Sequence, residues 1–303
     1  MRRFLLNMAI FAALIAVCDA AIGLALSHLA RTAPYGQTRR LNDISYNVTD
    51  SVIVLGSSLA RYNYNPATLE DSLGMSCYNC GEERNGIVLM LGRFSLITSR
   101  YTPSLIIYDV ECDYDLRRDN LRQYLPPLRY YYGRPCVDTL FAAVSAAEPL
   151  LMLSGCYHYG YDVAQLVGDH IRPNHLHYKG YNPKPWSMRR PPEPTAEEPF
   201  EHSPAKLALL DRLMCCCDSL GIPLVLTISP KYGATSDSVF TPLTRMAASR
   251  GVPVINHFCD TVYNTRAELY MDPIHLNSRG SGLYSSQIAS EIKALTGLPE
   301  RAQ

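Results

Sequence analysis

The stretch SVIVLGSSLARYN, residues 51–63, decides the fold. Its first half is a short apolar run that ends at Gly56, and such a run predicts a buried strand. Four similar runs predict further strands at 77–81, 104–110, 223–229 and 253–258. Helical spacing or helix-start signals lie between them, at 66–73, 85–100, 204–219, 238–250 and 280–295. Apolar strands that alternate with helices indicate a parallel sheet covered on both faces. We therefore expect an α/β fold, a three-layer α/β/α domain with about five parallel strands.

Composition excludes several classes of protein. The chain has 303 residues, and its 28 Lys and Arg balance its 28 Asp and Glu. Because phosphate binding needs an excess of positive charge, nucleic acid is not an expected partner. Hydrophobic residues make up 47% of the chain, which excludes disorder.

The N-terminus has the pattern of a membrane anchor. Arg2 and Arg3 precede an apolar run from Phe4 to Leu26, and about 23 residues are enough to span a bilayer. The arginines place the N-terminus in the cytoplasm. We expect a single-pass anchor at 1–30 in the cytoplasmic (inner) membrane, a linker at 31–50 and an extracytoplasmic, periplasmic domain at 51–303. A cleaved signal peptide and a lipid on Cys18 are the weaker alternatives.

Asp19 is unusual within this apolar run, because a charge inside a membrane span is costly. Either the span ends early and Asp19 lies near the outer interface, or Asp19 pairs with a partner helix.

A long insertion at 111–203 interrupts the alternation of strands and helices after the third strand. In open parallel sheets, ligands bind beyond the carboxyl ends of the strands, so the insertion is expected to cap the site. It contains Trp186, the only tryptophan, and many of the tyrosines, which suit either packing of the cap or a sugar-binding wall. The histidines His170, His175 and His177 lack matched ligands nearby, so we interpret them as loop residues.

The cysteines do not indicate a metal or cofactor. Cys77 and Cys80 lie three residues apart in a predicted strand, so their side chains point to opposite faces. If the insertion lies in an oxidising compartment, one disulfide among Cys112, Cys136 and Cys156 is plausible, and its pairing is left open. We expect no metal and no cofactor.

Two short motifs carry the chemistry. Ser58 follows the first strand and opens a helix, where backbone N–H groups and the helix dipole favour negative charge. Such a position suits a nucleophile. Asp272 precedes His275 by three residues just before the last helix, and a carboxylate can hold an imidazole in the tautomer that a general base needs. Each motif alone is weak evidence.

Together, Ser58 after the first strand and Asp-x-x-His before the last helix resemble the SGNH (GDSL-like) hydrolase superfamily. The resemblance covers about residues 50–110 and 204–296 and implies a flavodoxin-like sheet. It also implies that Ser58 is the nucleophile, His275 the base and Asp272 its orienting carboxylate. An anchored form with a long insertion is similar to bacterial envelope proteins tied to O-acetylation of polysaccharides. The expected function is a serine esterase or O-acyltransferase that acts on acyl esters, foremost acetyl esters, of an envelope carbohydrate.

The sequence departs from that superfamily at the oxyanion hole. In YNCGEERNGI, Arg84 stands where a second glycine is expected, so the donor is left open among Gly81, Arg84 and Gly86, of which we favour the two glycines. No asparagine follows the third strand, which continues into Asp109–Asp113. These departures support an alternative: a catalytically weak scaffold or glycan-binding subunit whose partner is a membrane O-acyltransferase.

Overall fold

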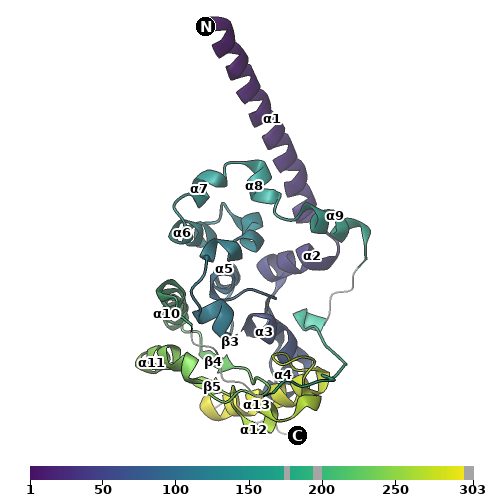
Figure 1. The fold of residues 1–303 in the computed structure, drawn as a ribbon, viewed down its shortest axis with the longest axis vertical. Coiled ribbons are helices and arrows are strands. Elements are labelled where there is room, and N and C mark those ends of the chain that lie inside the picture. Colours follow the sequence, from purple (N-terminus) through teal and green to yellow (C-terminus); the bar gives the residue numbers. More distant parts are fainter. Residues whose placement is uncertain (174–177, 194–199, 297–303) are drawn as a thin grey trace. The chain divides into compact units, whose positions relative to one another are not determined.

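The computed structural model describes residues 1–173, 178–193 and 200–296 (Figure 1). Contacts between residues divide the chain into two units. The N-terminal unit comprises Met1–Asn47 and Leu121–Leu176, and the sheet unit comprises Val48–Asn120 and His177–Gln303. Each unit is described separately below.

The sheet unit is built on five parallel strands in the order β2-β1-β3-β4-β5. Their bounds are Val52–Gly56 for β1, Cys77–Asn79 for β2, Leu105–Asp109 for β3, Leu224–Ile228 for β4 and Val254–Asn256 for β5. This is the flavodoxin-like order, so the predicted fold class is confirmed. Every residue of β1, β3 and β4 is buried, as expected for strands covered on both faces.

Helices surround this sheet close to their predicted positions. The longer ones are α4 (Pro66–Leu73), α5 (Ile87–Thr98), α10 (Pro204–Ser219), α11 (Thr241–Ser249) and α13 (Ser278–Thr296). Shorter helical segments are α3 (Ser58–Asn63), η2 (Cys112–Leu116), η5 (Tyr178–Gly180), η6 (Ser238–Phe240), α12 (Thr261–Asn264) and η7 (Ala267–Leu269). Helix α10 begins where it was predicted because Ser203 caps it, its hydroxyl accepting the N–H of Lys206.

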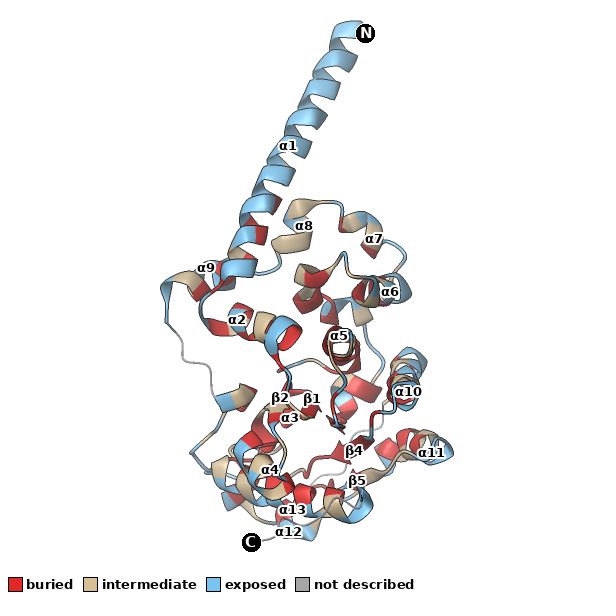
Figure 2. Ribbon diagram, turned by 180° about the vertical axis from the view of Figure 1, so that it is seen from behind, coloured by how far each residue is buried: buried red, intermediate tan, exposed pale blue. Residues whose placement is uncertain are grey.

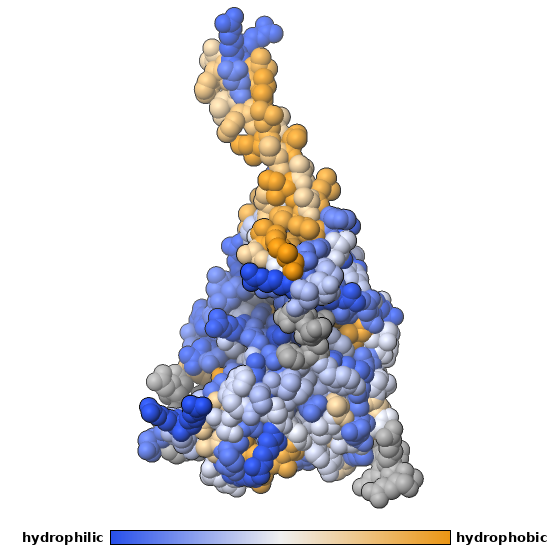
Figure 3. Space-filling model, turned by 90° about the vertical axis from the view of Figure 1, so that its right-hand side faces the viewer, coloured by the Kyte–Doolittle hydropathy of each residue, from blue (hydrophilic) through white to orange (hydrophobic). Residues whose placement is uncertain are grey.

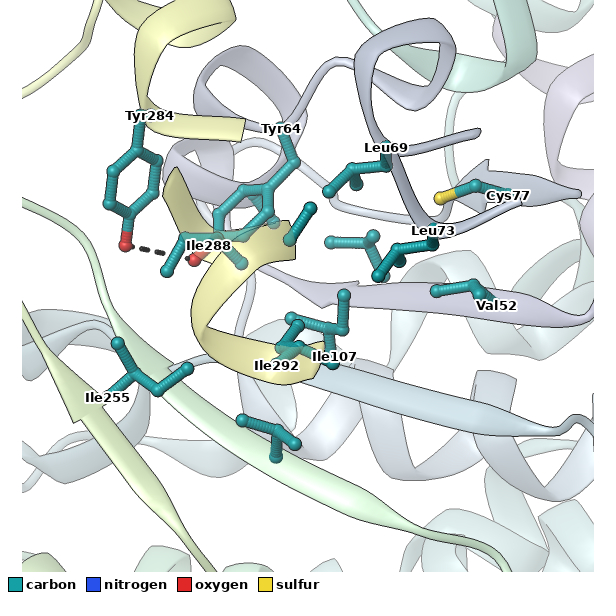
Figure 4. Close-up of a cluster of buried hydrophobic side chains, with 14 of the residues drawn as sticks. Val52, Tyr64, Leu69, Leu73, Cys77, Ile107, Ile255, Tyr284, Ile288 and Ile292 are labelled. Atoms are coloured by element: carbon teal, nitrogen blue, oxygen red, sulfur yellow. Dashed lines mark hydrogen bonds between the residues drawn. The ribbon is translucent and has the colours of Figure 1, made fainter. Parts of the chain in front are cut away.

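The core under one face of the sheet joins the strands to α4 and α13 (Figure 4). Val52 and Ile107 of the strands pack in the same cluster as Leu69 of α4 and Ile288 of α13. The only polar link drawn in this cluster is a hydrogen bond of 3.3 Å between the hydroxyl groups of Tyr64 and Tyr284. This packing fixes the start of α13 relative to β1, the two places from which the predicted site residues come.

The described residues of the N-terminal unit form helices that are joined by turns and loops. It contains α1 (Arg2–Thr32), α2 (Gly36–Asn42), η1 (Asp43–Asn47), η3 (Leu121–Tyr124), η4 (Pro126–Tyr131), α6 (Pro135–Val144), α7 (Glu148–Leu151), α8 (Gly155–Tyr159) and α9 (Val163–Ile171). Residues 31–50, predicted as a linker, therefore hold α2 and η1. The insertion at 111–203 contributes residues to both units.

Helix α1 is long and apolar enough to span a membrane, by length and composition. Most of its side chains are exposed, and burial begins only at Gly23 (Figure 2). Apolar side chains cover it along its length, below a hydrophilic N-terminal end (Figure 3).

All ten cysteines are free thiols. No disulfide joins any two of Cys112, Cys136 and Cys156 in this structure. Cys112 is buried in the sheet unit, whereas Cys136 and Cys156 lie on different helices of the N-terminal unit.

Candidate active site

The turn from β1 into α3 places Ser58. Gly56 has a φ of 144°, and a Cβ there would lie 2.6 Å from the carbonyl oxygen of Asp109, so only glycine fits. Ser57 caps the helix, because its Oγ accepts the N–H of Leu59 at 3.1 Å. Ser58 is the first residue of α3, so its own N–H has no acceptor within the helix.

The loop before α13 brings Asp272 and His275 to Ser58. Nδ1 of His275 lies 2.9 Å from Oδ2 of Asp272, and Nε2 lies 2.8 Å from Oγ of Ser58. These contacts assign the neutral tautomer in which Nδ1–H donates to Asp272 and Nε2 accepts the serine hydroxyl. The three residues predicted from separate motifs thus form one hydrogen-bonded series.

Asp272 is held ionised beside His275. Burial works to raise the pKa of Asp272, but hydrogen bonds from His275 and the backbone N–H of Ile274 prevail and lower it below its usual value. The loop is anchored in turn to the helix that carries Ser58, because Asn63 Oδ1 accepts the N–H of Leu276 at 3.0 Å.

Tyr62 and Asn63 were not predicted from the sequence. The ring of Tyr62 meets His275 edge-on, with centroids 4.9 Å apart, and fixes the plane of the imidazole. Nothing in the stretch ARYN distinguishes these two side chains from ordinary helix residues, because their partners are more than 200 residues away.

A second group of carboxyls lies at the carboxyl end of β3. Asp109 accepts the hydroxyl of Tyr64 and both the N–H and hydroxyl of Ser229. Asp115 accepts two backbone N–H groups and the hydroxyl of Tyr108. Glu111 accepts the hydroxyl of Ser57, the residue before Ser58.

Burial controls the charge of these three carboxyls. It raises the pKa of Asp109 to about 7, of Glu111 to about 8 and of Asp115 to about 6. Glu111 accepts the fewest hydrogen bonds of the three and has the highest pKa, so at neutral pH it is more fully protonated than Asp109 or Asp115.

The two glycines expected in the oxyanion hole lie near the site in different settings. Gly81 packs against α3, where a Cβ would lie 2.6 Å from the backbone nitrogen of Arg61. Its N–H donates to Oδ1 of Asn79 at 2.9 Å and is therefore engaged. Gly86 precedes α5 and packs against the loop of Asp115, where a Cβ would lie 2.5 Å from Oδ1.

Two hollows of the sheet unit lie beside the series formed by Ser58, His275 and Asp272. A cavity of about 50 Å³ is lined by Leu59, Glu111 and Ile274, among others. An open hollow next to Asp272 is lined by Trp186 and Met271. Trp186 is 57% exposed.

A lysine joins two aromatic rings beside that hollow. Nζ of Lys184 lies 4.8 Å from the ring centroid of Tyr62 and 5.6 Å from that of Trp186. The backbone holds Lys184 near the site, because its carbonyl accepts the N–H of Ser278 at 2.7 Å.

Within the described residues, no group of three or more His, Cys, Asp and Glu side chains is arranged so that it could hold a metal ion. Cys77 and Cys80 are both fully buried, and burial raises the pKa of Cys77. His170 contacts the carbonyl oxygen of Leu29 through Nε2. His175 and His177 lie outside the described residues.

No family model and no curated protein matches the sequence. Among solved structures, the chain is similar to a Bacteroides fragilis protein that carries the provisional name acylhydrolase. They share 11% identity over 86% of this chain and 97% of that chain, with a TM-score of 0.45.

The chain is also similar to two structures of a family two carbohydrate esterase from Clostridium thermocellum. One is an active-site mutant, with 9% identity over 82% of this chain and 64% of that chain and a TM-score of 0.43. The other is a complex with cellohexaose, with 9% identity over 82% of this chain and 65% of that chain and a TM-score of 0.42. The chain spans just under two thirds of these esterase chains. Similarities this distant assign neither a family nor an activity to it.

Proposed function

We propose that this protein is a membrane-anchored serine esterase or O-acyltransferase that acts on acyl esters of a carbohydrate, with acetyl as the preferred acyl group. One observation carries the proposal: the hydrogen-bonded series from Asp272 through His275 to Ser58. This is the arrangement that activates a serine hydroxyl for acyl transfer.

The chemistry follows in two halves. His275 Nε2 takes the proton of Ser58 while Oγ bonds to the ester carbonyl carbon, and the carbonyl oxygen becomes an oxyanion. The N–H of Ser58 points from the helix start toward that charge. The ester C–O bond then breaks, His275 protonates the leaving alkoxide, and the acyl group stays on Ser58. Water or a sugar hydroxyl attacks this acyl-enzyme in the second half, with His275 as base, and releases an acid or a new ester.

The cavity beside Ser58 supports a small acyl group. Its walls include Leu59 and Ile274, the chain neighbours of Ser58 and His275. A volume of about 50 Å³ leaves room for only a few non-hydrogen atoms. An acetyl group fits this limit, whereas a long fatty acyl chain does not.

The exposed ring of Trp186 supports a carbohydrate as the other half of the ester. Lys184 lies between this ring and the buried ring of Tyr62, beside Asp272. Aromatic rings offer an apolar face to a sugar ring, and a lysine can donate hydrogen bonds to its hydroxyl groups.

The packing of α1 supports a retained anchor over a cleaved signal peptide. Leu26 and Ala30 of α1 share a core cluster with Leu166 of α9. The side chain of Asn42 donates to the carbonyl oxygen of Ala30 at 2.7 Å. Cleavage after an N-terminal signal would remove part of this folded unit. With Arg2 and Arg3 on the cytoplasmic side, the rest of the chain lies outside the inner membrane.

The test uses the full chain in detergent with an aryl acetate, comparing wild type with Ser58→Ala and following the protein by intact mass. We expect turnover and an acetyl adduct in the wild type alone, with Ser58→Ala lowering the rate by about 10⁵-fold or more. An adduct without turnover would identify a transferase that awaits its sugar acceptor. A folded wild type with neither adduct nor turnover would contradict the proposed activity.

A second candidate is a glycan-binding or scaffold subunit of a membrane O-acyltransferase system. It is favoured by the engaged N–H of Gly81, which leaves fewer donors for an oxyanion. Binding of an acetylated oligosaccharide that Ser58→Ala leaves unchanged, together with no acyl adduct, would support this candidate.

A further inference from the structure

Helix α1 joins the rest of the N-terminal unit through an unusually close contact. A Cβ on Gly23 would lie 2.6 Å from Cα of Gly155, so the backbones of α1 and α8 touch. Beside this contact, the Asp19 carboxylate accepts the hydroxyl of Ser154 at 2.7 Å and the N–H groups of Gly155 and Cys156 at 2.7 and 3.0 Å. Asp19 is thus satisfied within its own chain and needs no partner helix.

Helix geometry sets the depth of this contact. From Phe4 to Gly23 the helix rises about 29 Å, at 1.5 Å per residue. The hydrocarbon core of a bilayer is about 30 Å thick. If the core begins just after Arg2 and Arg3, it ends near Gly23, so the contact with α8 lies at the outer edge of the hydrocarbon. Stopping the span at Asp19 would leave it at about 22 Å, too short for the core.

The segments that flank α8 expose apolar side chains at this level and, on α9, up to about 10 Å beyond it, where His170 contacts the carbonyl oxygen of Leu29. Helices α8 and α9 lie on opposite sides of the base of α1 in both ribbon views (Figures 1 and 2). Leu150, Leu153 and Ile171 are 70, 79 and 68% exposed. We name the exposed apolar set of these segments the collar: Leu150, Leu153, Tyr161, Val163, Val167 and Ile171.

Helix α9 carries apolar side chains on two of its faces, and one of these faces is exposed. Val163, Val167 and Ile171 recur every four residues and form one exposed stripe. Leu166 lies on another face and packs in the cluster with Leu26 of α1. The helix therefore buries one apolar face against the anchor and leaves a second one open.

We propose that the collar inserts into the interfacial layer of the same bilayer that α1 spans, on its outer side. The occupant is lipid because the collar segments contact α1, whose apolar surface is exposed, through Asp19 and Leu29. They lie at and just beyond the depth where the hydrocarbon ends. Helices with one apolar stripe commonly lie in the membrane interface, and tyrosines are enriched at that depth. The collar then holds the N-terminal unit against the membrane. This inference rests on the anchoring part of the proposed function and is independent of the catalytic part.

The experiment places a single fluorescent tryptophan in the full chain, in a Trp186→Phe background. Leu153→Trp and Ile171→Trp report on the collar, Leu14→Trp on the span, and Tyr46→Trp, in η1 beyond the end of α1, is the matched control. Each variant is reconstituted into phosphatidylcholine vesicles with brominated acyl chains and compared with unbrominated vesicles. We expect bromine to quench tryptophan at 14, 153 and 171 and to leave tryptophan at 46 unaffected. Acrylamide, a quencher that stays in water, should quench tryptophan at 46 and leave tryptophan at 14, 153 and 171 protected.

Each other outcome contradicts the proposal in a recognisable way. Quenching at position 14 without quenching at 153 and 171 would mean that α1 spans the membrane while the collar stays in water. Protection of 153 and 171 from both quenchers would mean that a second copy of the chain covers the collar. If bromine fails to quench position 14, the anchor itself is wrong, whatever the esterase assay shows.

Discussion

Two carboxyl groups flank the start of helix α3 and take opposite charge states. Asp272 pairs with the imidazole of His275, and its pKa lies below the usual value. Glu111 accepts one hydroxyl, from Ser57, and burial raises its pKa to about 8. Glu111 is buried, whereas the side chain of Asp272 is 41% exposed. Burial and the donors that each carboxyl meets therefore decide its charge together.

The difference in charge between Asp272 and Glu111 also gives the two sides of the site different roles. The ionised side, at Asp272, prepares His275 and borders the exposed ring of Trp186. The neutral side, at Glu111, lines the small cavity and keeps negative charge away from the place where the proposed reaction forms an oxyanion.

The largest expected effect comes from neutralising the ionised side. Asp272→Asn keeps the shape of the side chain but no longer holds Nδ1 of His275 as a donor, so the wrong tautomer faces Ser58. We expect kcat/KM for an aryl acetate to fall by about 10⁴-fold. The matched change on the other side, Glu111→Gln, should cost less than about tenfold at pH 7, since the replaced group is already neutral. Equal losses in the two variants would break the comparison.

The sequence predicted this site because its parts lie where a parallel sheet must bring them together. Ser58 follows a central strand and His275 precedes the last helix, and both positions are set by strand order and by the packing of α13 on α4. The span of α10, Pro204–Ser219, was predicted to the residue because serine, proline and glycine mark its ends.

Other features of the fold and the site depend on contacts between distant parts of the chain, which the local sequence pattern does not encode. The proton on Glu111 follows from burial among Asp109 and Asp115, which only the folded chain brings about. The engagement of Gly81 N–H by Asn79 depends on the tight turn after β2, not on residue type. In the N-terminal unit, the linker expected at 31–50 contains helices, because its backbone finds partners in the insertion, such as the Asp169 carboxylate that accepts the N–H of Thr38.

The pH dependence of activity tests the neutral side directly. Above its pKa of about 8, Glu111 adds a negative charge beside the helix start, where it opposes the oxyanion. Asp109, Asp113 and Asp115 contribute to that pKa by repulsion. We expect kcat/KM of the wild type to fall about fivefold from pH 8 to pH 9, as the protonated fraction of Glu111 falls from about a half to about a tenth. Glu111→Gln should stay flat over this range. A Glu111→Gln profile that falls with the wild type would assign the fall to another group.

The same charge states predict how stability depends on pH. Asp109, Glu111 and Asp115 have folded-state pKa values above their unfolded ones, so they bind extra protons in the folded state. Their contribution to stability is complete below about pH 4 and is lost as pH rises through 6 to 8. Asp272, with its lowered pKa, contributes above about pH 4 and loses this contribution in acid.

Thermal unfolding midpoints measured from pH 5 to pH 9 should therefore fall by several degrees in the wild type. Over the same pH range, the midpoint should fall less in Glu111→Gln than in the wild type. In Asp272→Asn it should fall as much as in the wild type. An equally steep fall in Glu111→Gln would mean that Glu111 is ionised in the folded state as it is in the unfolded state, contrary to the comparison.

The smallest expected effect lies at the outer edge of the ionised side. Trp186→Ala removes an exposed ring that is proposed to stack on the sugar, and such a contact is worth about 0.5–1.5 kcal/mol. KM for an acetylated oligosaccharide should rise about two- to tenfold. Aryl acetate, which has no sugar to stack, should react at the wild-type rate, because His275 keeps its contacts with Asp272 and Tyr62. If both substrates lose activity equally, Trp186 supports the loop of Asp272 rather than the sugar, and the division of the site by task is wrong on this side.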